Sequence, residues 1–308
     1  MNFWQQLPRP FWCLAPMEDV TDTVFRQIIS GVGKPDVLFT EFIHVEAILH
    51  GARDRLKFTA SERPLAAQIW GTDPERFLAA AQVIDQLHFD GIDINLGCPV
   101  RDVVNQGACS ALIGRNSQVA EIIQAVKRGT SLPVSVKTRI GQKQIITEEW
   151  VGFLLTQDLA AITIHGRTAT EMSQAPTHWD EIGKAVDIKN RLQSQTLIIG
   201  NGDVQNLDQA REYMATYGVD GVMLGRAAIT NPAVFAQVEL SKSQRLQLLA
   251  DHIDLFANTW GNAKHFAILK KFVKGYVNGF TNAAAMREEL MATYDLAGLK
   301  SKLKELMQ

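Results

Sequence analysis

Eight short runs of apolar and β-branched residues recur along the first three quarters of this chain, and helical patterns separate most of them. Such runs are typical of buried strands in a parallel sheet, which need helical crossovers between them. Eight units within about 220 residues predict a closed (β/α)8 barrel, or TIM barrel, rather than an open doubly wound sheet, which commonly has about five to seven strands. The predicted strands span residues 11–17, 36–42, 65–71, 91–97, 133–139, 160–166, 196–202 and 221–226.

Polar side chains collect where one predicted strand after another ends. In a barrel these ends converge on one face, where catalytic loops lie. Because loops are usually polar, any single polar side chain at a strand end needs no functional explanation. The Lys and the Arg inside the run PVSVKTRIG do need one, since a buried strand should be apolar there. The residues concerned are Glu41, Gln68, Asn95, Cys98, Lys137, Arg139, His165, Arg167, Asn201, Asp203 and Arg226.

Beyond residue 237 the strand patterns stop, and apolar residues recur at helical spacing of three and four. The predicted fold class is therefore α/β, with a TIM barrel in residues 1–240 and a C-terminal all-α helical bundle in residues 241–308. The helical stripes are Leu246, Leu249, Ile253 and Phe256, then Phe266, Leu269, Val273 and Tyr276, and finally Leu299, Leu303 and Leu306.

Composition limits the class of protein further. With 308 residues, of which 46% are hydrophobic and 21% charged, the chain is expected to be soluble and globular, and not disordered, collagenous or a disulfide scaffold. It has neither a basic, apolar leader nor a run of about 18 apolar residues, so export and membrane spanning are not expected. Three cysteines without the paired spacing of a zinc site favour a reducing cytoplasm.

The charge is divided unevenly along the chain. A formal charge of −2 argues against a protein coated in positive charge to hold nucleic acid. However, residues 241–308 carry 10 Lys and Arg against 6 Asp and Glu, a net charge of +4, whereas residues 1–240 carry 21 against 27, a net charge of −6. A nucleic-acid partner would therefore have to bind beside the helical tail.

The segment DINLGCP places Cys98 directly after the fourth predicted strand, three residues beyond Asn95. A lone cysteine is usually a small buried hydrophobe, which we expect for Cys13 and Cys109. The strand-end position of Cys98 favours a function. Because a free thiol has a pKa of about 8.5, it is mostly protonated at neutral pH and can donate a proton.

Lys137 and Arg139 lie two residues apart on one strand, so their side chains point to the same side. In a barrel mouth such a pair needs an anion or a polar ligand to offset its desolvation. For Arg139 an ion pair with Glu41 or Asp93 is an equal alternative, whereas the deeper position of Lys137 favours a bound cofactor.

The last two predicted strands end in GNGD, residues 200–203, and in LGRAA, residues 224–228. Barrels often bind phosphate with backbone amides from these two loops, and glycine lets the backbone approach closely. A phosphate-bearing cofactor is therefore predicted, whereas no Rossmann or Walker motif is present. His165 ends the sixth strand and is expected to hydrogen-bond a heterocycle or phosphate. No metal site is predicted.

In the tail, Lys264, Lys271 and Lys274 are expected on the side of their helix opposite the stripe that begins at Phe266. A solvated charged face is the usual explanation of such a pattern. The functional alternative is contact with phosphates of a nucleic acid.

Seven motifs together resemble, in order and spacing, the flavin-dependent tRNA-dihydrouridine synthases. They are APMEDVTDTVFR (15–26), QIWG (68–71), DINLGCP (93–99), SVKTRIG (135–141), IHGRT (164–168), GNGD (200–203) and LGRAA (224–228). The resemblance implies a barrel that binds FMN and a helical domain, 241–308, that helps to hold tRNA. The segment after GCP departs from the family pattern, with Asp102 in place of a common basic residue and Cys109 in place of a common glycine. Because its length is kept, we expect Cys98 to be presented normally and Cys109 to be structural.

The resemblance also implies roles for single residues. Cys98 matches the proton donor. Asn95, Arg139 and Arg167 match positions that hold the target uracil, and Lys271 and Lys274 lie in the tRNA-binding tail. The flavin would contact Pro16, Met17, Glu18, Gln68, Lys137 and His165, and its phosphate Asn201, Gly202, Asp203, Gly225 and Arg226.

The chemistry implied is the reduction of FMN by NADPH, transfer of hydride to C6 of a uracil and protonation of C5 by Cys98. Lys137 would stabilise negative charge on the reduced flavin. A paired, stacked uridine must be taken out of the helix first. A monomer in the cytoplasm, with no membrane partner, is expected. Two alternatives stay open: another FMN barrel that acts on a free pyrimidine, such as a dihydroorotate dehydrogenase, and an RNA-binding or chaperone protein without catalysis.

Overall fold

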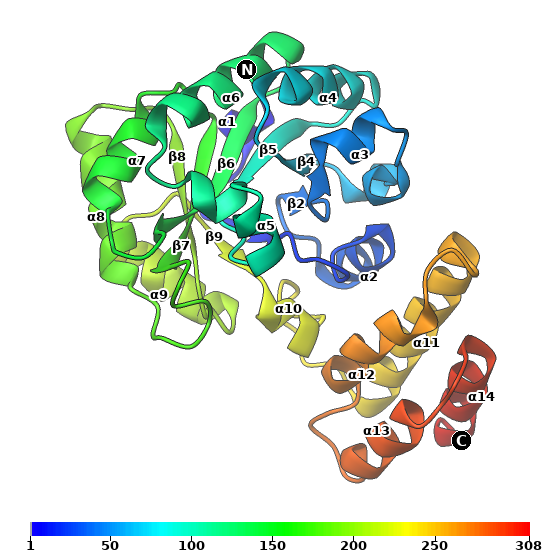
Figure 1. Ribbon diagram of the computed structural model, residues 1–308. Helices are drawn as coiled ribbons and strands as arrows, with labels where there is room; N and C mark the ends of the chain where they lie inside the picture. Colours follow the sequence, from blue (N-terminus) through cyan, green and yellow to red (C-terminus); the bar gives the residue numbers. More distant parts are fainter. Residues whose placement is uncertain (1) are drawn as a thin grey trace.

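The computed structural model describes residues 2–308 and contains a parallel barrel followed by a helical tail (Figure 1). The strands follow one another in the order β1-β9-β8-β7-β6-β5-β4-β2. The circle closes where Cys13 of β1 pairs with Val37, just before β2, and the Leu14 amide donates to the Val37 carbonyl at 3.1 Å. The barrel strands are β1 (Phe11–Leu14), β2 (Leu38–Phe39), β4 (Leu65–Trp70), β5 (Gly91–Leu96), β6 (Val134–Gly141), β7 (Ala161–Thr168), β8 (Leu197–Asn201) and β9 (Gly221–Leu224).

All eight predicted strands are therefore confirmed, each within its predicted segment or shifted by one or two residues at its end. One short strand, β3 (Ile43–His44), was not predicted; it pairs with the end of β4 beside the barrel mouth. Helices cover the outside of the barrel, as expected for βα units (Figure 1). They are α2 (Thr23–Gly33), α3 (Val45–Leu49), α4 (Pro74–Gln86), α6 (Asn116–Gly129), α7 (Thr147–Leu155), α8 (Trp179–Arg191) and α9 (Leu207–Tyr217), with 3-10 turns at Asp54–Leu56, Ala60–Glu62 and Cys109–Leu112. Two short helices, α5 (Arg101–Asn105) and α10 (Arg226–Thr230), lie at the mouth instead.

The end of the barrel opposite the mouth is closed by a short N-terminal helix, α1 (Phe3–Gln6). It buries Trp4 to 1% exposure against Phe11 and Phe39, with ring centroids 6.2 and 6.3 Å apart. At this end the barrel interior is thus a packed core rather than an open channel.

The tail is a bundle of helices, as predicted. Ser241 caps its first helix in a reciprocal pair with Gln244, which fixes the point where the helical region begins. The predicted apolar stripes face its core, although Phe266 and Leu306 are only partly buried. The elements are α11 (Lys242–Trp260), a 3-10 turn η4 (Phe266–Leu269), α12 (Lys270–Tyr276), α13 (Ala283–Met291) and α14 (Leu296–Leu306).

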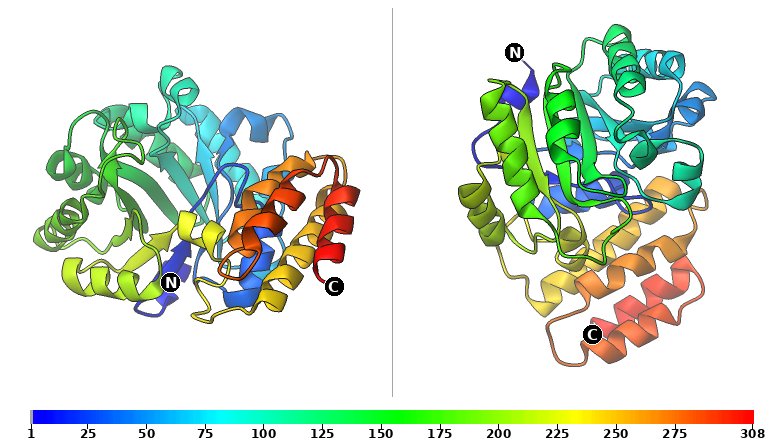
Figure 2. Two further views of the ribbon diagram at one scale, coloured as in Figure 1. Left: turned by 90° about the horizontal axis from the view of Figure 1, so that it is seen from below. Right: turned by 60° about the vertical axis from the view of Figure 1, so that its left-hand side comes forward.

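The carboxylate of Asp22, beside the mouth, is one of the groups that attach the tail to the barrel. Its Oδ1 accepts from the Phe25 amide at 3.0 Å and so caps α2, while its Oδ2 accepts from Trp260 Nε1 at 2.7 Å and from Lys264 Nζ at 3.1 Å. Phe25 of α2 also stacks on Phe272 of α12 with ring centroids 4.8 Å apart. In Figure 2 the tail, in orange and red, accordingly lies beside α2 in blue.

The placement of Lys264 on a helix face is wrong. Lys264 lies in the turn between α11 and η4, and its Nζ bonds Glu41 Oε2 at 3.3 Å as well as Asp22. Its ammonium also lies over the Trp260 ring, 4.4 Å from the centroid. With both carboxylates engaged, this lysine anchors the tail and is neither on a solvated face nor free to contact phosphate.

None of the helices within residues 2–308 is long and apolar enough to cross a membrane.

We predict that Asp22→Ala lowers the free energy of unfolding by about 2–4 kcal/mol, because it removes a helix cap, leaves the buried Trp260 N–H without a partner and leaves Lys264 with Glu41 alone. Urea denaturation of the full chain measures this change. The matched control is Asp54→Ala, whose carboxylate is 67% exposed and pairs only with Lys57; its effect should stay below about 1 kcal/mol. Equal effects of the two substitutions would contradict the anchoring role of Asp22.

Candidate active site

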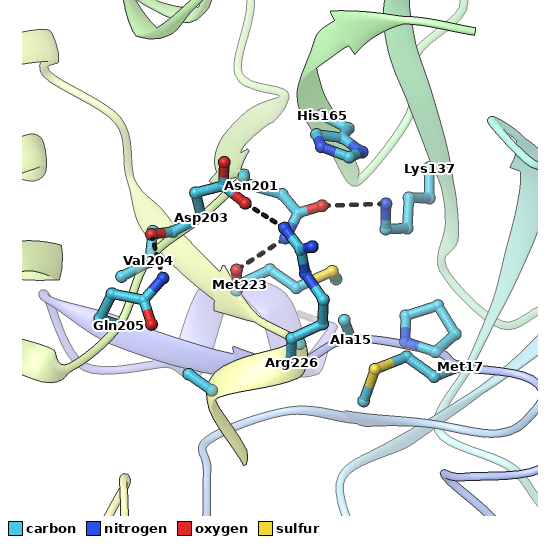
Figure 3. Close-up of a pocket in the computed structure, with 14 residues that line it drawn as sticks. Ala15, Met17, Lys137, His165, Asn201, Asp203, Val204, Gln205, Met223 and Arg226 are labelled. Atoms are coloured by element: carbon cyan, nitrogen blue, oxygen red, sulfur yellow. Dashed lines mark hydrogen bonds and ion pairs between the residues drawn. The ribbon is translucent and has the colours of Figure 1, made fainter. Parts of the chain in front are cut away.

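A cavity of about 190 Å³ opens at the mouth of the barrel, and we name it the central cavity (Figure 3). The loops after β1, β8 and β9 and the side chains of β6 and β7 form its walls. Of the predicted cofactor residues it brings together Pro16, Met17, Lys137, His165, Asn201, Gly202, Asp203, Gly225 and Arg226. Gln68 is fully buried beneath the mouth, and Glu18 faces a different cavity, described below.

The second glycine of the GNGD loop, Gly202, cannot be replaced by a residue with a side chain without strain. Gly202 has a φ of +135°, and a Cβ at this position would lie 2.4 Å from Thr177 Cγ2 and 3.2 Å from His165 Cδ2. No other residue adopts this backbone without strain. Gly225, across the cavity, lies against Ala15 and Met17. The two loops predicted to bind phosphate therefore line one cavity and expose backbone there.

Asp203 organises two arginines at this end of the cavity. Its carboxylate pairs with Arg167 and with Arg226, and the bond to Arg167 is the main reason why its pKa lies below the usual value. Arg226 stays 61% exposed in its side chain, so its charge remains available to a ligand. Arg167 is 2% exposed and also donates from Nε to the Ala175 carbonyl at 2.6 Å.

Lys137 reaches across the mouth to Asn201, to whose Oδ1 its Nζ donates at 3.2 Å (Figure 3). Asn201 is in turn held by the bond from its Nδ2 to the Met223 carbonyl at 2.8 Å. Burial, followed by the nearby Arg139, lowers the pKa of Lys137 to about 8, so it is still mostly charged at pH 7. Burial and the surrounding cations lower the pKa of His165, whose imidazole is therefore neutral.

The alternative of an ion pair between Arg139 and Glu41 or Asp93 is wrong. Arg139 instead donates from Nε to the Gly97 carbonyl at 2.8 Å and from its Nη1 to the carbonyls of Thr168 and Met172 at 3.0 and 3.1 Å. It therefore ties the backbone next to Cys98 to the loop that follows β7. Burial lowers its pKa to about 10, which leaves it charged at neutral pH.

A chain of hydrogen bonds beneath the mouth orients the backbone at Cys98. Asp93 accepts from Ser135 Oγ at 2.6 Å and from Gln68 Nε2 at 2.7 Å; Gln68 Oε1 then accepts from Asn95 Nδ2 at 3.1 Å. Asn95 Oδ1 is left to accept the amides of Gly97 and Cys98, each at 3.0 Å. The side chain of Asn95 thus holds the cysteine turn in place.

Asp93 is a site residue that the sequence analysis did not identify as functional. Burial raises its pKa to about 6, against the opposing effect of the bonds from Ser135 and Gln68. The signal was present in the sequence, because a carboxylate in the middle of the run GIDINL is as unusual in a buried strand as Lys137 is.

Cys98 lies at the end of β5, half-buried beside Val103 and the loop that follows. Burial raises the pKa of its thiol above the ordinary value, so the sulfur is protonated at neutral pH. Cys109 is fully buried, has a φ of +51° and carries a thiol whose pKa burial raises still further. This left-handed backbone accounts for the glycine expected at that position.

A second cavity, of about 380 Å³, adjoins Cys98, and we keep the name second cavity for it. Glu18, Phe42, Ile43, His44, Ala47, Arg55, Trp70, Cys98, Val100 and Val103 line it. Of these, only Glu18 and Cys98 are site residues predicted from the sequence. Trp70, His44 and Arg55 come from three separate segments, and the unpredicted strand β3 brings His44 to the mouth.

Within residues 2–308, no group of three or more His, Cys, Asp or Glu side chains is placed to hold a metal ion. The chemistry available at the mouth is that of a protonated thiol, a lysine ammonium, a neutral imidazole and two arginines around a glycine-lined cavity. Such a set is suited to an anionic cofactor and to proton transfer.

Solved structures share the barrel fold at low sequence identity. Morphinone reductase superposes with a TM-score of 0.53 at 12% identity, covering 76% of this chain and 87% of that chain. Histamine dehydrogenase from Rhizobium sp. 4-9 superposes with a TM-score of 0.55 at 12% identity, covering 79% of this chain and 48% of that chain. At this identity the likeness concerns the fold alone, and it agrees with the predicted TIM barrel.

Similarity to named proteins extends over nearly the whole length. A protein of Staphylococcus aureus (strain COL) named "Probable tRNA-dihydrouridine synthase" is 41% identical over 314 residues, covering 99% of this chain and 95% of the relative. A protein of Bacillus subtilis (strain 168) named "Probable tRNA-dihydrouridine synthase 2" is 43% identical over 301 residues, covering 95% and 92%. The family model "Dihydrouridine synthase (Dus)" matches residues 13–308. The chain therefore belongs to the dihydrouridine synthase family.

Proposed function

We propose that FMN binds in the central cavity, that NADPH is the reductant, and that Cys98 is the proton donor in the reaction of this family. Family membership carries the reaction class: the protein is a flavin-dependent oxidoreductase that reduces uridine in tRNA to dihydrouridine. Membership of this family therefore favours neither of the two alternatives, a barrel enzyme that acts on a free pyrimidine or an RNA-binding protein without catalysis.

The residues of the central cavity fit FMN. At one end, the exposed Arg226 guanidinium and the backbone at Gly202 and Gly225 suit a phosphate. At the other, the Lys137 ammonium suits the pyrimidine edge of the ring, which becomes negatively charged on reduction. The neutral His165 can hydrogen-bond the cofactor without adding charge. When bound, the flavin supplies the hydride that adds to C6 of the uracil.

Cys98 supplies the proton that C5 of the uracil requires. Its raised pKa keeps the proton on the sulfur at neutral pH until the ring takes it up. Asn95 and Arg139 hold the backbone on both sides of this residue, through the amides of Gly97 and Cys98 and the carbonyl of Gly97. We propose that the remaining N–H groups of Asn95, Arg139 and Arg167 face the uracil carbonyls.

The helical tail supports binding of tRNA. Lys271 Nζ lies 3.3 Å from Asp19 Oδ2, in a pair that is about half exposed on both sides, and Lys274 lies exposed one turn further along α12. A phosphate can replace Asp19 as the partner of Lys271 at little cost, because exposed ion pairs contribute less than about 1 kcal/mol. Lys271 lies beside the barrel mouth, because its partner Asp19 belongs to the loop that follows β1.

The division into a catalytic barrel, residues 1–240, and a tRNA-binding tail, residues 241–308, forms part of this proposal. We further propose that the protein acts as a monomer in the cytoplasm, with no membrane partner.

Replacement of Cys98 by Ala tests the proton donor. We expect the Cys98→Ala variant to bind FMN and to be reduced by NADPH, while dihydrouridine formation in tRNA falls by about 10²-fold or more, the usual contribution of a general acid. Flavin absorbance follows the first two properties and mass spectrometry of digested tRNA follows the third. The matched control is Cys109→Ala, a nearby buried thiol, which should keep most of the product rate. Wild-type rates in Cys98→Ala would remove Cys98 from the acid role.

Charge reversal on α12 tests the tail. The double variant Lys271→Glu/Lys274→Glu should bind tRNA more weakly, and the slope of log affinity against log salt should flatten by about one to two units, since each lysine neutralises about one phosphate. Lys300→Glu serves as the control because Lys300 pairs with Asp254, on the side of the tail formed by α11 and α14. An unchanged slope in the double variant would assign Lys271 and Lys274 to an ordinary solvated face.

A further inference from the structure

The second cavity is an aromatic-walled hollow that extends from Cys98 away from the central cavity. Its walls include the indole of Trp70 and the imidazole of His44, which meet edge to face with centroids 4.5 Å apart. Burial lowers the pKa of His44, so the ring is uncharged at neutral pH. Val100, whose surface is 51% exposed, and Val103 complete the apolar wall next to Cys98.

The rim of this cavity is polar and is rigidly held. Arg55 pairs with both carboxylate oxygens of Glu18 and donates to the Phe42 carbonyl at 3.3 Å. Its guanidinium also lies 3.9 Å from Glu41, the carboxylate that bonds Lys264 of the tail. An aromatic floor with a hydrogen-bonding rim is the combination by which proteins hold a single unstacked base.

The second cavity lies on the way from the active site to the tail. Cys98 forms one of its walls, whereas the opposite rim connects to the tail through the contacts Arg55–Glu41–Lys264. Asp19, the partner of Lys271, directly follows the rim residue Glu18. The second cavity therefore lies between Cys98 and the part of α12 that carries Lys271, where a polynucleotide that contacts both would run.

We propose that the second cavity receives the nucleobase adjacent to the target uridine, stacked on Trp70, so that two consecutive bases leave the tRNA stack together. This inference rests on the proposed function and adds to it a recognition step. Because every base has a π-face, stacking alone tolerates any neighbour. Contacts of the Glu18–Arg55 rim with the base edge would then distinguish one neighbour from another.

A chemical double-mutant cycle tests this proposal on the full chain loaded with FMN. The target uridine is first mapped in an unmodified tRNA transcript, and transcripts are then prepared with a single abasic nucleotide on its 5′ or 3′ side. The proteins compared are the wild type, Trp70→Leu, Trp70→Phe and Trp12→Leu. Trp12 is a half-buried tryptophan on β1 beside Arg211, outside the second cavity, and is the matched control. kcat/KM for dihydrouridine formation is measured for every pair, together with the thermal melting of each protein.

We expect one of the two abasic transcripts to lower the wild-type kcat/KM by about tenfold, the loss typical of one base–aromatic stacking contact. On the intact transcript, the kcat/KM of Trp70→Leu should be lower than that of the wild type by about the same factor. Its kcat/KM should then not fall further on the abasic transcript, because the contact is already lost. Trp70→Phe, which keeps a stacking face, should respond as the wild type does, and so should Trp12→Leu.

The proposal would be overturned if the abasic change lowered the kcat/KM of Trp70→Leu by the same factor as that of the wild type, so that the two losses multiply. It would also be overturned if neither abasic transcript lowered the wild-type kcat/KM. A rise in KM for NADPH without a change for tRNA would also overturn it, by assigning the cavity to the nicotinamide ring. If the wild type forms no dihydrouridine even on the intact transcript, the proposed function itself fails, so the two failures can be told apart.

Discussion

Several charged side chains lie buried in the mouth of one barrel, and the arrangement of the site follows from the need to give each of them a partner. An unpaired buried charge costs several kcal/mol, more than a marginally stable chain can tolerate at several positions. Asp93 is satisfied by Ser135 and Gln68, and Arg139 by three backbone carbonyls. These contacts also position the turn at Cys98, because the same bonds that satisfy Arg139 and Asn95 fix the backbone around this residue.

The same requirement joins the tail to the barrel. Asp22 and Glu41 carry negative charge beside the mouth, and Lys264 from the tail neutralises both, while Trp260 covers the contact. The barrel therefore does not merely precede the helical region in the chain; it supplies the carboxylates on which that region is anchored. As a result, the exposed Lys271 of α12 lies beside Asp19, in the loop that follows β1 at the mouth.

The sequence predicted the barrel, its eight strands and nine of the residues that line the central cavity, because parallel strands end on one face and the polar residues at those ends were recognisable one by one. Glu18 and Gln68, predicted for the same cofactor site, lie outside this cavity. The sequence did not predict where the charges of Arg139 and Lys264 go. The ion pair considered for Arg139 and the helix-face position of Lys264 are both wrong, because backbone carbonyls and distant carboxylates leave no spacing pattern in a sequence. The second cavity was missed for a similar reason, since His44, Arg55 and Trp70 become neighbours only when β3 pairs with β4. Asp93, in contrast, was visible as a carboxylate in an apolar run.

The central claim is that a reduced flavin and a protonated thiol in this barrel act together on uridine within tRNA. The most direct measurement incubates the FMN-loaded protein with NADPH and an unmodified tRNA transcript, and then locates by mass spectrometry each uridine that has gained two hydrogen atoms. Reduction confined to one or a few positions, and dependent on both FMN and Cys98, is the result we predict. Turnover of free orotate or dihydroorotate by the same preparation, with no dihydrouridine in the tRNA, would contradict it.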